Sequence, residues 1–124
     1  MISICRRFKF DAAHHLPFYI GKCCNVHGHR WILDVEVSGQ VQDQGPNTGM
    51  IIDFSLLKEI VNQNIIDKLD HTDLNLSLTN PTAELMIMTI TFILQNELSR
   101  NNLVLERLRL YETEDSYAEW RLDK

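Results

Sequence analysis

The order in which the hydrophobic period changes along the chain constrains its fold more than any other sequence feature. Residues 2–10 and 31–38 alternate apolar and polar side chains, as half-buried strands do. Residues 52–70 and 85–98 have the apolar spacing of helices, and the second segment is apolar on most sides. Residues 103–113 and 117–123 alternate again. The predicted order is therefore strand, strand, helix, helix, strand, strand.

This order predicts an α+β fold in which a four-stranded antiparallel sheet carries two helices on one face. The chain of 124 residues has a common length for one domain, and we expect a single domain over residues 1–124. A four-stranded sheet has two open edges, which proteins protect by closing the sheet or by pairing it with other copies. We therefore expect a homo-oligomer.

Local signals place the starts of both helices. Asp53 is the expected N-cap of the first helix. Its apolar stripe should consist of Leu56, Leu57, Ile60, Ile65 and Ile66. The second helix should begin with Asn80 as N-cap and Pro81 at the first helical position, because proline fits the first helical turn.

Charge and composition exclude several classes of protein. The formal net charge of −5 argues against a nucleic-acid-binding surface, which needs clustered lysine and arginine. No stretch of 18 apolar residues predicts a membrane span, and the first residues do not form a signal peptide. Three cysteines, two of them adjacent, do not suggest a disulfide framework. We expect a cytoplasmic protein whose partner is a small molecule.

Histidines next to the strand-like segments suggest a metal site. His27 and His29 precede the clear alternation, and residues two apart on a strand share a face, with Cα atoms roughly 6.5–7 Å apart. His14 or His15, at the end of the first strand, would meet them if the two strands pair. Three histidines with a fourth position left open are typical of catalytic zinc. A pair of surface histidines is the alternative.

Cys23 and Cys24 allow three roles: metal ligands, a redox pair, or a reactive thiol beside a metal. A thiol close to a metal ion and an imidazole has a lowered pKa and is a thiolate at neutral pH. The neighbours Asp70 and His71 have the chemistry of an acid that orients a base, although loops commonly contain this dipeptide. Glu112, at a strand end, would suit a ligand that presents two parallel N–H donors.

Together these segments resemble the 6-pyruvoyl-tetrahydropterin synthase/QueD family, whose fold is the tunnelling fold or T-fold. Six motifs carry the resemblance in the family's order and span nearly the whole chain. They are F-D-A-A-H (10–14), C-x-x-x-H-G-H (23–29), G-M-I-I-D-F (49–54), L-D-H-x-x-L-N (69–75), N-P-T-A-E (80–84) and Y-E-T (111–113). The short spacing between Cys23 and the H-G-H motif resembles the 6-carboxy-5,6,7,8-tetrahydropterin synthase type.

The resemblance implies a role for each candidate residue. His14, His27 and His29 match the zinc ligands, and Cys23 matches the catalytic cysteine. Asp70 and His71 match the acid–imidazole pair that works with that cysteine, and Glu112 matches the carboxylate that anchors the pterin ring. His15 and Cys24 are spare side chains of ligating types. The family forms trimers whose sheets join into a barrel, stacked as hexamers with active sites between subunits.

The implied activity is zinc-dependent conversion of 7,8-dihydroneopterin triphosphate to 6-carboxytetrahydropterin, acetaldehyde and triphosphate, in queuosine (7-deazaguanine) biosynthesis. The alternative within the family is a 6-pyruvoyltetrahydropterin synthase or a related lyase that acts on the pterin side chain. Two alternatives from other classes are a non-catalytic pterin- or metal-binding module and a redox sensor that uses Cys23 and Cys24.

Overall fold

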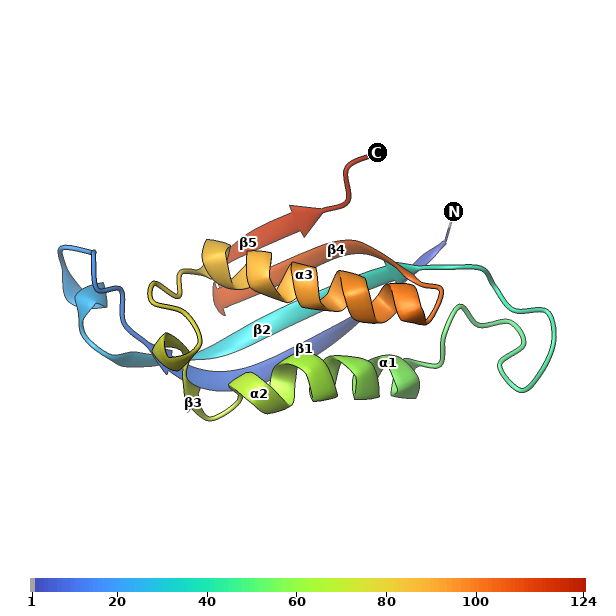
Figure 1. The fold of residues 1–124 in the computed structure, drawn as a ribbon, viewed down its shortest axis with the longest axis horizontal. Coiled ribbons are helices and arrows are strands. Elements are labelled where there is room, and N and C mark those ends of the chain that lie inside the picture. The colour runs from blue at the N-terminus through green and yellow to red at the C-terminus, as the bar shows by residue number, and fades with distance from the viewer. Residues whose placement is uncertain (1) are drawn as a thin grey trace.

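A five-stranded mixed sheet forms one layer of the fold, and the helices form the other (Figure 1). The computed structural model describes residues 2–124. The strand order in the sheet is β3-β1-β2-β4-β5, and every neighbouring pair is antiparallel except β3 and β1. The strands are β1 (Ser3–His14), β2 (His27–Ser38), β3 (Thr72–Asp73), β4 (Val104–Thr113) and β5 (Ser116–Arg121).

The expected α+β architecture is confirmed, but the prediction of four antiparallel strands is wrong. The fifth strand, β3, has two residues and runs parallel to the end of β1, with Ala12 opposite Thr72 and Ala13 opposite Asp73. The sequence pattern contains no sign of β3, because two residues are too few to show an alternating period. The pairing is set instead by the helical segment before β3, which returns the chain to the edge of β1 (Figure 1).

The first helical segment lies over β1 and is divided by one π-helical turn. It comprises α1 (Phe54–Val61), the π turn at residues 62–66 and α2 (Asp67–Leu69). Asp53 caps α1 as expected, since its Oδ1 accepts a hydrogen bond from the Ser55 backbone N–H at 2.8 Å. Leu56 does not join the predicted stripe: it is exposed, and Val61 is buried instead. The extra residue of a π turn shifts the helix phase, and Ile65 and Ile66 both reach the core.

The second helix, α3 (Ala83–Arg100), begins later than expected. Its N-cap is Thr82, whose Oγ1 accepts a hydrogen bond from the Leu85 N–H at 3.1 Å. The prediction of Asn80 as N-cap with Pro81 at the first helical position is therefore wrong. The reason is tertiary: the carbonyl oxygen of Pro81 faces the His14 ring, at 2.9 Å from Nδ1, instead of starting the helix.

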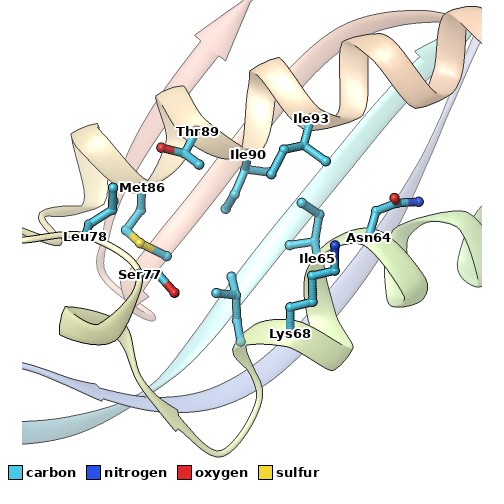
Figure 2. Close-up of a pocket in the computed structure, with 10 residues that line it drawn as sticks. Asn64, Ile65, Lys68, Ser77, Leu78, Met86, Thr89, Ile90 and Ile93 are labelled. Atoms are coloured by element: carbon cyan, nitrogen blue, oxygen red, sulfur yellow. The ribbon is translucent and has the colours of Figure 1, made fainter.

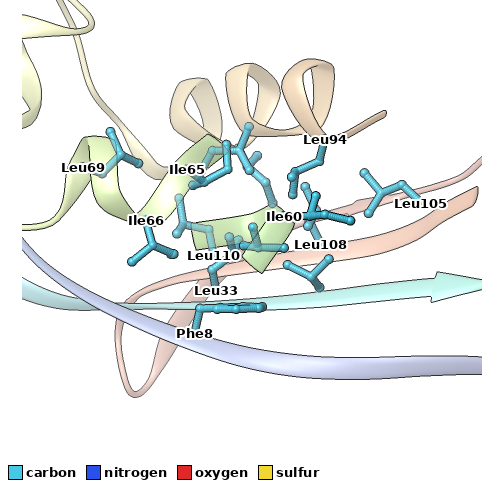
Figure 3. Packing of buried hydrophobic residues seen from close by; sticks show 14 of the residues in the cluster. Phe8, Leu33, Ile60, Ile65, Ile66, Leu69, Leu94, Leu105, Leu108 and Leu110 are labelled. Atoms are coloured by element: carbon cyan, nitrogen blue, oxygen red, sulfur yellow. The ribbon is translucent and has the colours of Figure 1, made fainter. Parts of the chain in front are cut away.

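The hydrophobic core lies between the helices and one face of the sheet (Figure 3). Alternate residues of the strands, such as Phe8, Leu33 and Leu108, pack against Ile65 and Leu94 of the helical layer. The helical elements of residues 2–124 include none that combines the length and the apolar character needed to cross a bilayer.

The opposite face of the sheet carries charged side chains in ion pairs. Arg7 and Asp34 form a double hydrogen bond between β1 and β2 at 2.7 and 2.9 Å. Glu119 on β5 accepts from Arg109 on β4 and from Arg121. The two faces of the same strands therefore differ sharply: one is an apolar core and the other is a polar surface.

Candidate active site

Pairing of β1 with β2 brings three histidines together at one end of the sheet. His14, the last residue of β1, lies opposite His27, the first residue of β2, and Ala12 lies opposite His29. The ring centroids are 4.6 Å apart for His14 and His27, 4.8 Å for His27 and His29, and 5.2 Å for His14 and His29. The expected shared face of His27 and His29 is confirmed, and strand pairing selects His14 as the third member.

Glu112 completes this group from β4. One ligand atom from each of His14, His27, His29 and Glu112 lies within 4.8 Å of the other three. The carboxylate Oε1 is 3.2 Å from Nε2 of His14 and 3.3 Å from Nε2 of His29. The sequence motif alone suggested an anchor for a ligand ring, and gave no sign that Glu112 lies against the histidines.

Hydrogen bonds to two backbone carbonyls leave Nε2 of two rings available. His14 Nδ1 is 2.9 Å from the carbonyl oxygen of Pro81, and His27 Nδ1 is 2.7 Å from that of Asn25. A carbonyl oxygen can only accept, so each ring carries a proton on Nδ1, and the neutral form of each ring keeps its lone pair on Nε2. Sequence analysis missed both carbonyls, because backbone atoms leave no mark in residue types.

Burial also suits these rings to a metal ion. His14 is completely buried, and the Nε2 atoms of His14 and His29 are buried without a hydrogen-bond partner among the described residues. Unpartnered buried nitrogens of this kind are rare in folded proteins. Burial lowers the pKa of His29, which favours the neutral ring that binds metals. Three imidazole rings and a carboxylate form a donor set that fits zinc.

Asp70 and His71 form a second group, beside Asp11 at the edge of β1. The Asp11 backbone N–H donates to Asp70 Oδ1 at 2.8 Å, and the other oxygen, Oδ2, is 3.1 Å from Nδ1 of His71. The hydrogen bond from the Asp11 backbone holds the pKa of Asp70 below its usual range. The His71 N–H donates to the Asp11 carbonyl at 2.6 Å, and His71 adopts a left-handed φ of 61°. The side chain of His71 is 79% exposed, so its Nε2 faces solvent.

Cys23 lies in the short 3-10 turn Lys22–Cys24, in the connection between β1 and β2. It is half-buried, and its carbonyl accepts a hydrogen bond from the Leu16 N–H at 2.8 Å. Cys24 is exposed. Among residues 2–124, neither cysteine belongs to the histidine group or to the Asp70 group. One copy of the chain therefore does not bring the candidate thiol, the histidines and the acid–base pair into a single cluster.

His15 also lies outside the histidine group. Its backbone is held by the side chain of Asn75, whose Oδ1 accepts from the His15 N–H at 2.9 Å and whose Nδ2 donates to the His15 carbonyl at 3.0 Å. Asn75 thus fixes the chain directly after His14. Its place in the motif of residues 69–75 was the available sequence signal, but the motif did not indicate this contact.

The structure contains a cavity away from the candidate site residues and an open hollow that some of these residues line. A cavity of about 150 Å³ between α2 and α3 is lined mainly by apolar side chains, among them Ile65, Met86 and Ile90 (Figure 2). None of the candidate site residues lines it. An open hollow of about 580 Å³ at the ends of β1, β2 and β3 is lined by residues of both groups, including His29 and His71.

Comparison with known protein families shows to which family this chain belongs. The family model described as 6-pyruvoyl tetrahydropterin synthase matches residues 3–123. The chain belongs to this family. The motif-based resemblance is thereby confirmed, and the family's members are enzymes that act on a pterin side chain.

Individual members of the family agree with this result. An Archaeoglobus fulgidus protein, provisionally named 6-carboxy-5,6,7,8-tetrahydropterin synthase, is 41% identical over 113 residues, which are 91% of this chain and 90% of that one. The 6-carboxy-5,6,7,8-tetrahydropterin synthase of Haemophilus influenzae is 48% identical over 71 residues, 57% of this chain and 50% of that protein. The structure of Caenorhabditis elegans 6-pyruvoyl tetrahydropterin synthase superposes with a TM-score of 0.82 at 25% identity, covering 98% and 96% of the chains.

Proposed function

We propose that this chain is a zinc-dependent 6-carboxy-5,6,7,8-tetrahydropterin synthase in the biosynthesis of queuosine. It would convert 7,8-dihydroneopterin triphosphate and one water to 6-carboxytetrahydropterin, acetaldehyde and triphosphate. The observation that carries this proposal is the convergence of His14, His27 and His29 in a chain whose relatives include proteins of that name. The cytoplasmic location expected from the sequence stays a prediction.

His14, His27 and His29 would bind the metal ion. His14 and His27 would use Nε2, because their Nδ1 atoms face backbone carbonyls, and His29 would use one of its ring nitrogens. Bound zinc would supply a Lewis acid that acidifies the hydroxyl groups of the substrate side chain and stabilises negative charge on their oxygens. The backbone carbonyls of Pro81 and Asn25 orient two of the rings before any ligand arrives. Such orientation lowers the cost of assembling the site.

Proton transfer would fall to Cys23 and to the Asp70–His71 pair. The Cys23 thiolate would remove a proton from the substrate side chain or from C6. Asp70 holds His71 through Nδ1, which leaves Nε2 of His71 free to give or take the complementary proton. Glu112 would anchor the pterin ring by accepting from its 2-amino and N3–H groups.

The separation of these groups in one copy supports an active site shared between subunits. Cys23 belongs to neither group of candidate residues, and Asp70 and His71 form a group of their own beside the edge strand β3. The outer edges of β3 and β5 are open in the single chain. Pairing of such edges between copies would form the trimer or hexamer expected for the family, and would bring His71 of one subunit to Cys23 of the next.

Product analysis tests the proposal directly. Zinc-loaded protein is incubated with 7,8-dihydroneopterin triphosphate, and the products are identified by mass. Release of acetaldehyde with 6-carboxytetrahydropterin is the expected result. The relationship to the Caenorhabditis elegans structure favours 6-pyruvoyltetrahydropterin as the second candidate product; in that case no acetaldehyde forms. Pterin binding without any product would contradict both activities.

A further inference from the structure

Glu112 occupies a position that its proposed role as a ring anchor does not require. A single carboxylate oxygen, Oε1, lies almost equally far from Nε2 of His14 and Nε2 of His29, at 3.2 and 3.3 Å. Both of these nitrogens are buried and have no hydrogen-bond partner among the described residues. The carboxylate therefore faces the point on which the histidines converge.

The charges at this point require a cation or a proton. With Nδ1 of His14 donating to Pro81, the neutral ring presents a lone pair at Nε2, and a carboxylate oxygen also presents lone pairs. Two acceptors repel each other at this distance unless a positive centre lies between them. Within residues 2–124 no lysine or arginine forms an ion pair with Glu112; its ion-pair partners are the two histidines.

The strand that carries Glu112 gives its side chain room to move. The pairing of β4 with β2 ends at Tyr111 opposite Ile32, and the pairing of β4 with β5 is irregular between Tyr111 and Thr113. Glu112 is about one-third exposed and also lines a hollow of about 260 Å³ that none of the three histidines lines. This hollow offers the side chain space away from the histidines.

We propose that Glu112 is the fourth protein donor of the metal centre in the substrate-free enzyme, and that a bound pterin withdraws it from the metal. The second part rests on the proposed function, because it takes Glu112 as the ring anchor. One carboxylate cannot hold the 2-amino and N3–H edge of the ring and also complete the metal site. Three histidines and one carboxylate close a four-donor zinc site, so substrate binding would open the position that catalysis needs.

Zinc affinity tests the first part without any substrate. Competition with a chromogenic chelator measures zinc binding to the whole chain and to the variants Glu112→Gln and Glu112→Asp. We expect at least about tenfold weaker zinc binding for both variants, because Glu112→Gln loses the negative charge and Glu112→Asp has a shorter side chain. The control Glu114→Gln removes the same charge from an exposed position two residues away and should leave affinity unchanged. Unchanged affinity in both Glu112 variants, with native circular dichroism, would overturn the proposal.

Cobalt substitution tests the exchange. The visible spectrum of the Co²⁺-loaded protein should differ from that of Glu112→Gln, because the donor set differs. Unsubstituted pterin is the probe, since it presents the ring edge but has no side-chain hydroxyl. Saturating pterin should convert the wild-type spectrum to that of Glu112→Gln and leave the variant's spectrum unchanged. A wild-type spectrum that no concentration of pterin alters would overturn the exchange.

These measurements fail separately from the proposed function. In one outcome, Glu112→Gln loses zinc affinity and the wild-type protein forms no product from 7,8-dihydroneopterin triphosphate. That outcome would support Glu112 as the fourth donor and contradict the synthase activity. The opposite outcome is also possible to observe: the Glu112→Gln variant keeps normal zinc affinity and an unchanged cobalt spectrum, while the wild-type protein releases acetaldehyde. That outcome would contradict the fourth donor and support the synthase activity.

Discussion

The Nδ1 atom of His14 lies 2.9 Å from the carbonyl oxygen of Pro81, a residue 67 positions later in the chain. This contact joins the end of β1 to the segment that leads into α3, and it sets which nitrogen of the buried ring is free. The proposed metal site therefore depends on a loop that supplies no metal ligand. Asn75 also stabilises this end of β1, because it holds the backbone of His15, the residue after His14.

Replacing Asn75 tests this support. Asn75→Ala removes hydrogen bonds to both backbone groups of His15 and to the Thr79 carbonyl. We expect the free energy of unfolding to fall by about 1–3 kcal/mol and zinc affinity to fall about tenfold. Urea unfolding and chelator competition measure the two effects. The control Asn96→Ala, at an exposed position, should change neither the free energy of unfolding nor the zinc affinity. An Asn75→Ala protein with wild-type zinc affinity would contradict a positioning role for Asn75.

Metal removal should stop the reaction and lower thermal stability. A ligand that binds only the folded state stabilises it by mass action, so chelator-treated protein should melt several degrees below zinc-loaded protein. Turnover should vanish and return when zinc is added back. His27→Ala should abolish zinc-dependent stabilisation, since one of three ring donors is lost. Full turnover after chelation, with no residual metal by elemental analysis, would remove zinc from the mechanism.

The two adjacent cysteines should behave differently. Cys23→Ala should lower kcat by at least about 100-fold, because the proposed proton-transfer group is lost. Cys24→Ala should remain active, since Cys24 is exposed and joins neither group of site residues. Steady-state kinetics on both variants distinguish them. An inactive Cys24→Ala beside a fully active Cys23→Ala would reverse the assignment.

Mixed oligomers test whether the site is shared between subunits. Cys23→Ala and His71→Ala should each be inactive alone. Refolded together in equal amounts, they should recover roughly a quarter of wild-type activity, because some interfaces then combine an intact Cys23 with an intact His71. Mixing the folded variants without subunit exchange is the control. No recovery in verified mixed oligomers would place both residues in the same subunit's site.

Acid should destabilise the protein through carboxylates such as Glu119. The hydrogen bond from Arg109, with a contribution from Arg121, holds the pKa of Glu119 below its usual range. A carboxylate with a lowered folded-state pKa stabilises the fold above its unfolded pKa of about 4.3, and this stabilisation is lost as pH falls further. The urea midpoint at fixed protein concentration should drop as pH falls below about 4.3, and drop less in Glu119→Gln. The exposed Glu114→Gln should follow the wild-type curve.

Local patterns in the sequence determined the four longer strands, the two helical segments, the cap at Asp53 and the shared face of His27 and His29. These features depend on periods of two or 3.6 residues and on side chains within a few positions of each other, so a linear pattern records them. The family motifs added the identity of the candidate site residues, which composition and period do not supply.

Tertiary structure alone decided the rest. The two-residue strand β3 forms because the chain returns to the edge of β1, and α3 starts after Thr82 because the Pro81 carbonyl faces His14. The meeting of Glu112 with His14 and His29 likewise depends on strand order and register. Such contacts join residues tens of positions apart and often involve backbone atoms. The residue type at one position does not specify them, whereas the packing of the whole chain does.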